Sequence, residues 1–175
     1  MKRHELEHVI RAAGAIAGST QLYIIGSQAI LGMYPDAPLE LLMSQKVDTW
    51  PAEDPAKADL IDGSIGELSP FLDTFGYYAH GIGPETAVLP VKWESRVVVV
   101  ENENTHGVRG LCLHPADLAV SKLVAGRDKD MLFVAAMLRH HLVRTEEIQR
   151  LIHEELVPAR RAETSSRLCQ LAGVG

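Results

Sequence analysis

Three groups of residues in the 175-residue chain have the types and order needed to bind a phosphate group together with Mg²⁺. Gly26-Ser27 follows an apolar run and precedes a helix-type sequence, so free backbone N–H groups and a serine hydroxyl would meet at a turn. Asp48 is a carboxylate that can ligate Mg²⁺ from a strand-type segment. Lys122 can neutralise phosphate charge from a later helix. Their order along the chain predicts a nucleotide site.

Each of these groups also has a plainer structural explanation. A Gly-Ser pair commonly forms an ordinary turn, and a single aspartate commonly caps a helix or lies at the surface. Lys122 could place its ammonium at a helix surface. Arg127 and Asp130 are three residues apart, which is the spacing of an ordinary ion pair on a helix.

The hydrophobic pattern predicts the elements that must position these residues. Apolar residues at helical spacing predict a first helix over residues 3–17. A short apolar run then predicts a buried strand over 22–25, followed by a helix over 27–33 with Ser27 as its N-cap. Further strands are expected over 44–51, 77–82, 97–100 and 108–113, the last two as an antiparallel hairpin, with a helix over 56–65.

The last third of the chain is predicted to be entirely helical, because apolar residues recur at helical spacing between glycine and proline breaks. Helices are expected over 114–126, 129–142, 145–156 (with Thr145 as its cap) and 158–172. We therefore expect an α/β fold, a small mixed β-sheet flanked by helices with a helical C-terminal portion. Residues 1–113 would form the α/β core and residues 114–175 would pack on it, together as one compact unit.

Composition limits the classes of function. A net charge of −6 and a calculated pI near 5.7 argue against broad adhesion to nucleic acid but allow a local basic site. The chain has no run of eighteen or more apolar residues and no apolar segment typical of a signal peptide, so we expect no membrane partner and a cytoplasmic location. Cys112 and Cys169 lack paired or metal-ligand spacing and are expected to be reduced thiols.

The chain resembles the minimal nucleotidyltransferases of the DNA polymerase β-like superfamily, which include toxin nucleotidyltransferases of the abortive-infection type and a related uncharacterised bacterial group. Their pattern is an apolar strand, Gly-Gly or Gly-Ser, a short helix, and a strand with two carboxylates one residue apart; residues 24–31 and 44–48 are similar to it. Residues 113–130 resemble the toxin-type segment in which a helix lysine precedes Arg-x-Lys-Asp, and this likeness is the more specific. The resemblance covers about residues 20–142.

This resemblance implies a nucleotidyltransferase-like core and a site at which Asp48 and Lys122 are catalytic and Asp48 binds Mg²⁺. It also implies NTP as substrate, an RNA (tRNA-like) or protein acceptor, and a cognate antitoxin as a partner. The substrate-binding residues that it implies are Gly26, Ser27, Arg127 and Asp130. Ser44 and Lys46, from the segment that falls at the second motif, are further candidates for substrate binding.

The chain departs from the family pattern at Lys46, where the first carboxylate of the acidic pair is expected. Paired carboxylates hold the cations of two-metal phosphoryl transfer, and a carboxylate with an ammonium does not readily replace them. Another acid could substitute, with Asp62, Glu67 and Glu101 as candidates, or one metal could suffice. Lys46 could itself take the place of a metal ion by neutralising phosphate directly. Alternatively, the chain is a catalytically inert nucleotide-binding or protein-interaction module, or a scaffold that docks a partner through residues 130–172.

Overall fold

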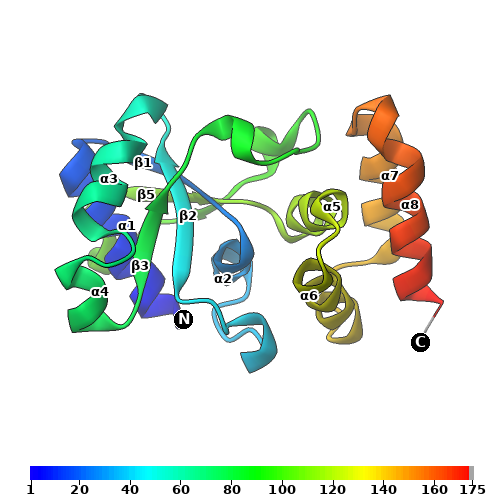
Figure 1. The fold of residues 1–175 in the computed structure, drawn as a ribbon, viewed down its shortest axis with the longest axis horizontal. Helices are drawn as coiled ribbons and strands as arrows, with labels where there is room; N and C mark the ends of the chain where they lie inside the picture. Colours follow the sequence, from blue (N-terminus) through cyan, green and yellow to red (C-terminus); the bar gives the residue numbers. More distant parts are fainter. Residues whose placement is uncertain (174–175) are drawn as a thin grey trace.

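The computed structural model describes residues 1–173, which form a five-stranded mixed sheet beside a group of helices (Figure 1). The strands lie in the order β3-β2-β1-β5-β4, with β1 central. β1 pairs in parallel with β5 and antiparallel with β2, β2 pairs in parallel with β3, and β4 pairs antiparallel with β5. The strands are β1 (Gln21–Ile25), β2 (Lys46–Pro51), β3 (Tyr78–Gly81), β4 (Val98–Val100) and β5 (Arg109–Cys112). The predicted α/β fold with a mixed sheet and a helical C-terminus is confirmed.

Helices cover the sheet and bury its apolar side chains. α1 (Arg3–Ala17) and α3 (Ala58–Ile65) pack against each other and against the strands, where Leu6, Ile10 and Ile61 are fully buried. α2 (Ile30–Met33) contacts β4, β5 and α5. It begins directly after the turn that ends β1, so the packing of this short helix fixes the position of that turn.

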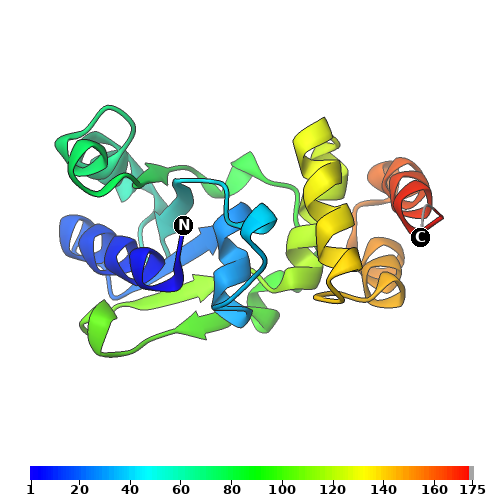
Figure 2. The same cartoon turned by 90° about the horizontal axis from the view of Figure 1, so that it is seen from below.

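The C-terminal helices form the other half of the molecule. α5 and α6 lie next to the sheet half, and α7 and α8 lie on their far side, as both views show (Figures 1 and 2). These helices are α5 (Pro115–Ala125), α6 (Asp128–Arg139), α7 (Thr145–Glu155) and α8 (Pro158–Ala172). The division into parts at residues 113 and 114 stays a prediction. Over residues 1–173, none of the helices has the length and apolar character needed to cross a membrane.

Three local features differ from expectation. α4 (Pro70–Phe75) was not predicted, although the Ser69 hydroxyl caps it by accepting from the Leu72 N–H and Gly76 ends it in the left-handed conformation. Ser27 is not an N-cap: it is the first residue of a 3₁₀ turn (Ser27–Ala29) that continues into α2. Thr145 likewise is the first residue of α7, and Arg144 holds the cap position. Both cap predictions were wrong because the helical backbone begins one residue earlier than expected.

Arg96 ties the segment before β4 to the helical half. Its Nε and Nη2 donate to the two carboxylate oxygens of Asp117 on α5, at 2.9 and 2.6 Å. Its Nη1 donates to Glu155 on α7 at 3.0 Å. Asp117 is fully buried and Glu155 nearly so, so the single guanidinium compensates two desolvated carboxylates. Burial acts to raise the pKa of Glu155, but hydrogen bonds from Arg96 and from the Lys92 N–H outweigh it and the pKa is lowered.

We expect Arg96→Met to destabilise the protein by about 3 kcal/mol, because it leaves two buried carboxylates without their cation. Urea unfolding at neutral pH measures this loss. Because the folded-state pKa of Glu155 lies below its unfolded value near 4.5, its stabilising effect is present above that pH and is lost as pH falls. The difference in the free energy of unfolding between the variant and the wild type should therefore become smaller below about pH 4.5. Arg150→Met is the control, since the Arg150–Glu154 pair is exposed and worth about 0.5 kcal/mol; equal losses in the two variants would contradict the prediction.

Candidate active site

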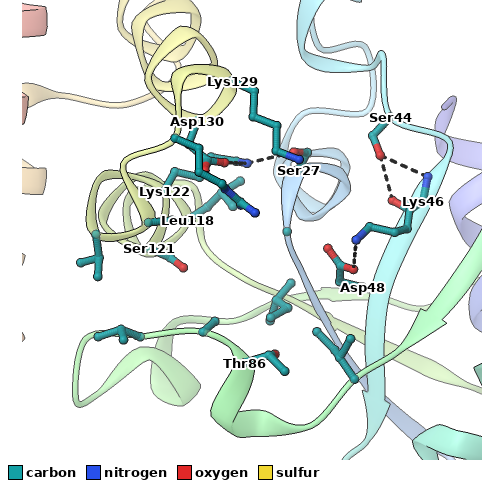
Figure 3. Close-up of a pocket in the computed structure, with 18 of the residues that line it drawn as sticks. Ser27, Ser44, Lys46, Asp48, Thr86, Leu118, Ser121, Lys122, Lys129 and Asp130 are labelled. Carbon is teal, nitrogen blue, oxygen red and sulfur yellow. Dashed lines mark hydrogen bonds and ion pairs between the residues drawn. The ribbon is translucent and has the colours of Figure 1, made fainter.

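A cavity of about 660 Å³ lies between the sheet half and α5–α6. Its walls are the turn after β1, the polar face of β2 and β3, the segment over residues 82–88, and the facing sides of the two helices. Figure 3 shows Lys46 and Asp48 on the strand wall, with Lys122, Lys129 and Asp130 across from them on the helix wall. The turn, the strands and the helices lie far apart in the sequence, so only the tertiary fold brings them together.

The strand wall carries a cluster of three side chains. Lys46 and Asp48 are two residues apart on β2 and share a face, while Val47 between them points into the core. His80 is the cross-strand neighbour of Asp48 on β3. Asp48 Oδ1 lies 2.9 Å from Lys46 Nζ and 2.9 Å from His80 Nδ1, and the two nitrogens are 3.2 Å apart. Both contacts to Asp48 therefore fall on one carboxylate oxygen.

The other carboxylate oxygen of Asp48 lies against Gly26. Gly26 has φ +71° and ψ −171°, a conformation that side chains with a Cβ rarely adopt. A Cβ at this position would overlap Asp48 Oδ2. Glycine is therefore favoured directly after β1 for a steric reason, because it lets the backbone of the turn approach the carboxylate of the neighbouring strand.

The helix wall is organised by Lys122 on α5. Its side chain is only 10% exposed, and its ammonium donates to Ser27 Oγ at 2.9 Å and to Asp130 Oδ1 at 3.2 Å. The ammonium also lies 4.4 Å from the centre of the Phe133 ring. Arg127 Nε donates to the second oxygen of Asp130 at 2.5 Å. The Arg127–Asp130 pair is therefore more than a surface pair, because Asp130 is buried and serves two cations.

Burial and charge set the protonation of this wall. Burial lowers the pKa of Lys122, and the neighbouring Asp130 carboxylate opposes that shift. Burial acts to raise the pKa of Asp130, but the hydrogen bond from Arg127 and the charge of Lys122 outweigh it, so the pKa is lowered. Asp130 is therefore held ionised, which keeps a full negative charge beside the Lys122 ammonium.

Positive charge predominates around the cavity although the chain is acidic overall. Two carboxylates, Asp48 and Asp130, are outnumbered by basic side chains that come from β2, α5, α6 and α8. These are Lys46, Lys122, Arg127, Lys129 and Arg160. The chain as a whole carries a net charge of −6, so the excess of positive charge is local to the cavity. Such a cavity attracts anions with several charges.

The structure brings together all of the site residues named from the sequence: Gly26, Ser27, Ser44, Lys46, Asp48, Lys122, Arg127 and Asp130 line the cavity. Their roles stay predictions. Sequence reasoning missed His80, Lys129 and Arg160, which also line it. Lys129 lies inside the Arg-x-Lys-Asp element, so its signal was available. His80 became recognisable only through the register of β3 on β2, and Arg160 through the packing of α8.

The donor set does not form the paired-carboxylate site of two-metal enzymes. Within residues 1–173, no three His, Cys, Asp or Glu side chains are grouped so that they could hold a metal ion. Of the acids considered as substitutes, Glu101 pairs with Arg109 at 3.4 Å and Glu67 lines a neighbouring cavity. Mg²⁺ binding by Asp48 therefore stays a prediction, and the arrangement of the acidic side chains does not support it.

The neighbouring cavity, of about 380 Å³, adjoins the first. Ser44, Lys46, His80 and Lys129 line both, so the cluster around Asp48 stands where the two cavities meet. Tyr78, the residue opposite Lys46 on β3, lines only the second cavity. Tyr77, by contrast, is buried and its hydroxyl contacts His8 Nδ1 at 2.8 Å, as expected of a core residue.

Comparison with known proteins gives a match to a protein family. A protein-family model described as "Nucleotidyltransferase of unknown function (DUF6036)" matches residues 4–170. No curated protein and no solved structure matches the chain. The match spans both the sheet half and the helical half, and so includes every wall of the cavity.

We expect Gly26→Ala to destabilise the protein by about 2–3 kcal/mol, because the added Cβ both strains a left-handed backbone and displaces Asp48. Gly63→Ala is the matched control: Gly63 lies within α3, and a Cβ there meets no atom within 4 Å. That control should be stabilised by about 0.4–1 kcal/mol. Urea unfolding of both variants measures the difference, and a neutral Gly26→Ala would show that the turn does not need glycine.

Proposed function

Because the chain belongs to this family of nucleotidyltransferases of unknown function, we propose that its cleft binds a nucleoside triphosphate and transfers the nucleoside monophosphate to a hydroxyl group of an acceptor. The observation that carries this proposal is the Lys122 ammonium, held between Ser27 and Asp130. That contact joins the turn after β1 to the helix wall, which is where the family resemblance expects the triphosphate.

Charge supports the choice of ligand. A triphosphate carries several negative charges, and the cavity offers an excess of basic side chains to neutralise them. Lys122 is fixed by its two partners, so its charge needs little reorganisation when phosphate arrives. Ser27 Oγ, beside that ammonium, can hydrogen-bond a phosphate oxygen. Catalysis by such a site consists mainly of positioning and charge neutralisation.

The transfer would proceed by direct displacement at the α-phosphorus. The acceptor hydroxyl oxygen forms a bond to that phosphorus while the bond from the phosphorus to the bridging oxygen of the β-phosphate breaks. Pyrophosphate leaves with the electron pair of the broken bond. Asp48 accepts the hydroxyl proton at Oδ2, because Oδ1 is already occupied by Lys46 and His80. Lys122 and Arg127 neutralise the charge that develops on the leaving pyrophosphate.

A second candidate function is a catalytically inert nucleotide-binding module, and it is favoured by one observation. The Lys46 ammonium contacts Asp48 directly and so occupies the carboxylate that would otherwise serve chemistry. In this case the cleft binds a nucleotide and releases it unchanged. The two functions differ in whether pyrophosphate is formed, not in whether the nucleotide binds.

We expect the wild-type protein to transfer α-labelled, but not γ-labelled, phosphate from an NTP to an acceptor and to release pyrophosphate. Each NTP is incubated with total RNA or with lysate protein, with Mg²⁺ and with EDTA. Asp48→Asn and Lys122→Met should lower the rate by about 10²–10³-fold. Arg150→Met, on the exposed face of α7, is the control and should keep the wild-type rate.

Binding measured in parallel separates the candidates. Binding without labelled acceptor or pyrophosphate under every condition would overturn transfer and leave the inert module. If calorimetry detects no binding of any NTP, both candidate functions are wrong.

The second cavity is where we place the acceptor, and its chemistry favours RNA over protein. Tyr78 offers a ring on which a base can stack, and Lys46 and Lys129 can contact the phosphates on either side. Lys46 and His80, which both contact the proposed proton acceptor Asp48, also line this cavity. An RNA acceptor also agrees with the toxin-type resemblance, for which a cognate antitoxin would be a further partner.

We expect Tyr78→Ala to raise the KM for an RNA acceptor about tenfold, because base stacking is worth about 1–3 kcal/mol. The Kd for NTP should not change, because Tyr78 lies outside the first cavity. Tyr78→Phe keeps the ring and should behave like wild type. An unchanged acceptor KM in Tyr78→Ala, or transfer to protein alone, would rule out this acceptor site.

A further inference from the structure

The cluster of Lys46, Asp48 and His80 stands where paired carboxylates would hold divalent cations. We propose that Lys46 replaces such a cation, so that the cleft binds the phosphates of an NTP without Mg²⁺. This inference rests on the proposed nucleotide binding and adds how that binding depends on metal. It is carried by the contacts of Asp48 and by the charge of the groups around it.

The contacts leave little room for a divalent ion at this point. Mg²⁺ prefers an octahedral shell of oxygen ligands at about 2.0–2.1 Å. Asp48 Oδ1 is instead contacted by the Lys46 ammonium and by a histidine nitrogen, each at 2.9 Å. A cation bound to Oδ1 would lie next to that ammonium and be repelled by it. Asp48 Oδ2 is the single remaining oxygen of this carboxylate, and one oxygen does not replace the pair of carboxylates that holds such cations.

The other acid that lines the cavity, Asp130, is already paired with two basic side chains. Asp130 is buried between Lys122 and Arg127, which contact one oxygen each, and it comes from the opposite wall. Drawing it toward a metal at Asp48 would leave two cations without their counter-charge. The cavity therefore provides no ready pair of carboxylates for a shared ion.

Charge balance shows why a lysine can serve instead. Two carboxylates with one Mg²⁺ sum to zero charge, and so do Lys46 and Asp48 together. The substitution thus removes the ion and its second ligand but keeps the local charge that the phosphates meet. Lys46 also lies at the junction of the two cavities, with its side chain 36% exposed, so it can contact a bound phosphate. An ammonium binds phosphate as a point charge with three donors.

Calorimetry with each NTP, in EDTA and in excess Mg²⁺, tests the proposal. We expect the wild-type Kd in EDTA to lie within about threefold of the value in Mg²⁺. Lys46→Asp restores the carboxylate pair, so its binding should weaken at least about tenfold in EDTA and recover with Mg²⁺. Lys46→Gln removes the charge without adding a ligand and should bind weakly in both conditions. Thermal unfolding checks that the variants remain folded.

Lys2→Asp is the matched control, because Lys2 is exposed at the start of α1 and does not line the cavity. It undergoes the same change of charge and should keep the wild-type ratio of Kd values. Wild-type binding that requires Mg²⁺ would overturn the inference and leave the proposed function standing. A Lys46→Asp variant that Mg²⁺ does not rescue would also overturn it. Absence of binding in both conditions would overturn the proposed function itself.

Discussion

The Lys122 ammonium is largely removed from water, and a buried charge is tolerated only where other polar atoms replace its hydration. Ser27 and Asp130 provide those atoms, from the turn after β1 and from α6. Three elements are thereby held at fixed positions, because moving any of them would leave the buried ammonium without one of its hydrogen-bond partners. The cavity depends on this constraint, since its two walls belong to the sheet half and the helical half.

The same arrangement explains how an acidic chain presents a basic cleft. Cations contributed by α5, by α6 and its N-cap, and by α8 line the same cavity as the strand wall, while the two carboxylates that line it are already paired. Low-dielectric walls strengthen the field between such charges. In the proposed function, specificity for a multiply charged anion comes from this local geometry, and the net charge limits adhesion elsewhere on the surface.

Local signals were enough to predict most of the fold and most of the site. Apolar periodicity located the strands and the long helices, and the order of Gly26-Ser27, Asp48 and Lys122 named residues that do share a cavity. What failed depends on tertiary context or on short elements. α4 has only six residues, so its caps are its main signal. His80 joins Asp48 through strand register, which no local pattern of the sequence specifies.

The energetics of the helix wall indicate why a buried polar group made of Lys122, Asp130 and Ser27 is present there. A buried ion pair rarely stabilises a fold more than well-packed apolar residues of similar volume, because desolvation offsets the attraction. Stability alone therefore does not explain why these polar side chains join α5 to the sheet, because an apolar contact would stabilise the fold equally well. They are suited instead to the proposed binding of an anionic ligand. Such a ligand adds negative charge beside Lys122 and Arg127, which share the single carboxylate of Asp130. In the proposed function, binding of that ligand offsets the free-energy cost of burying these charged groups.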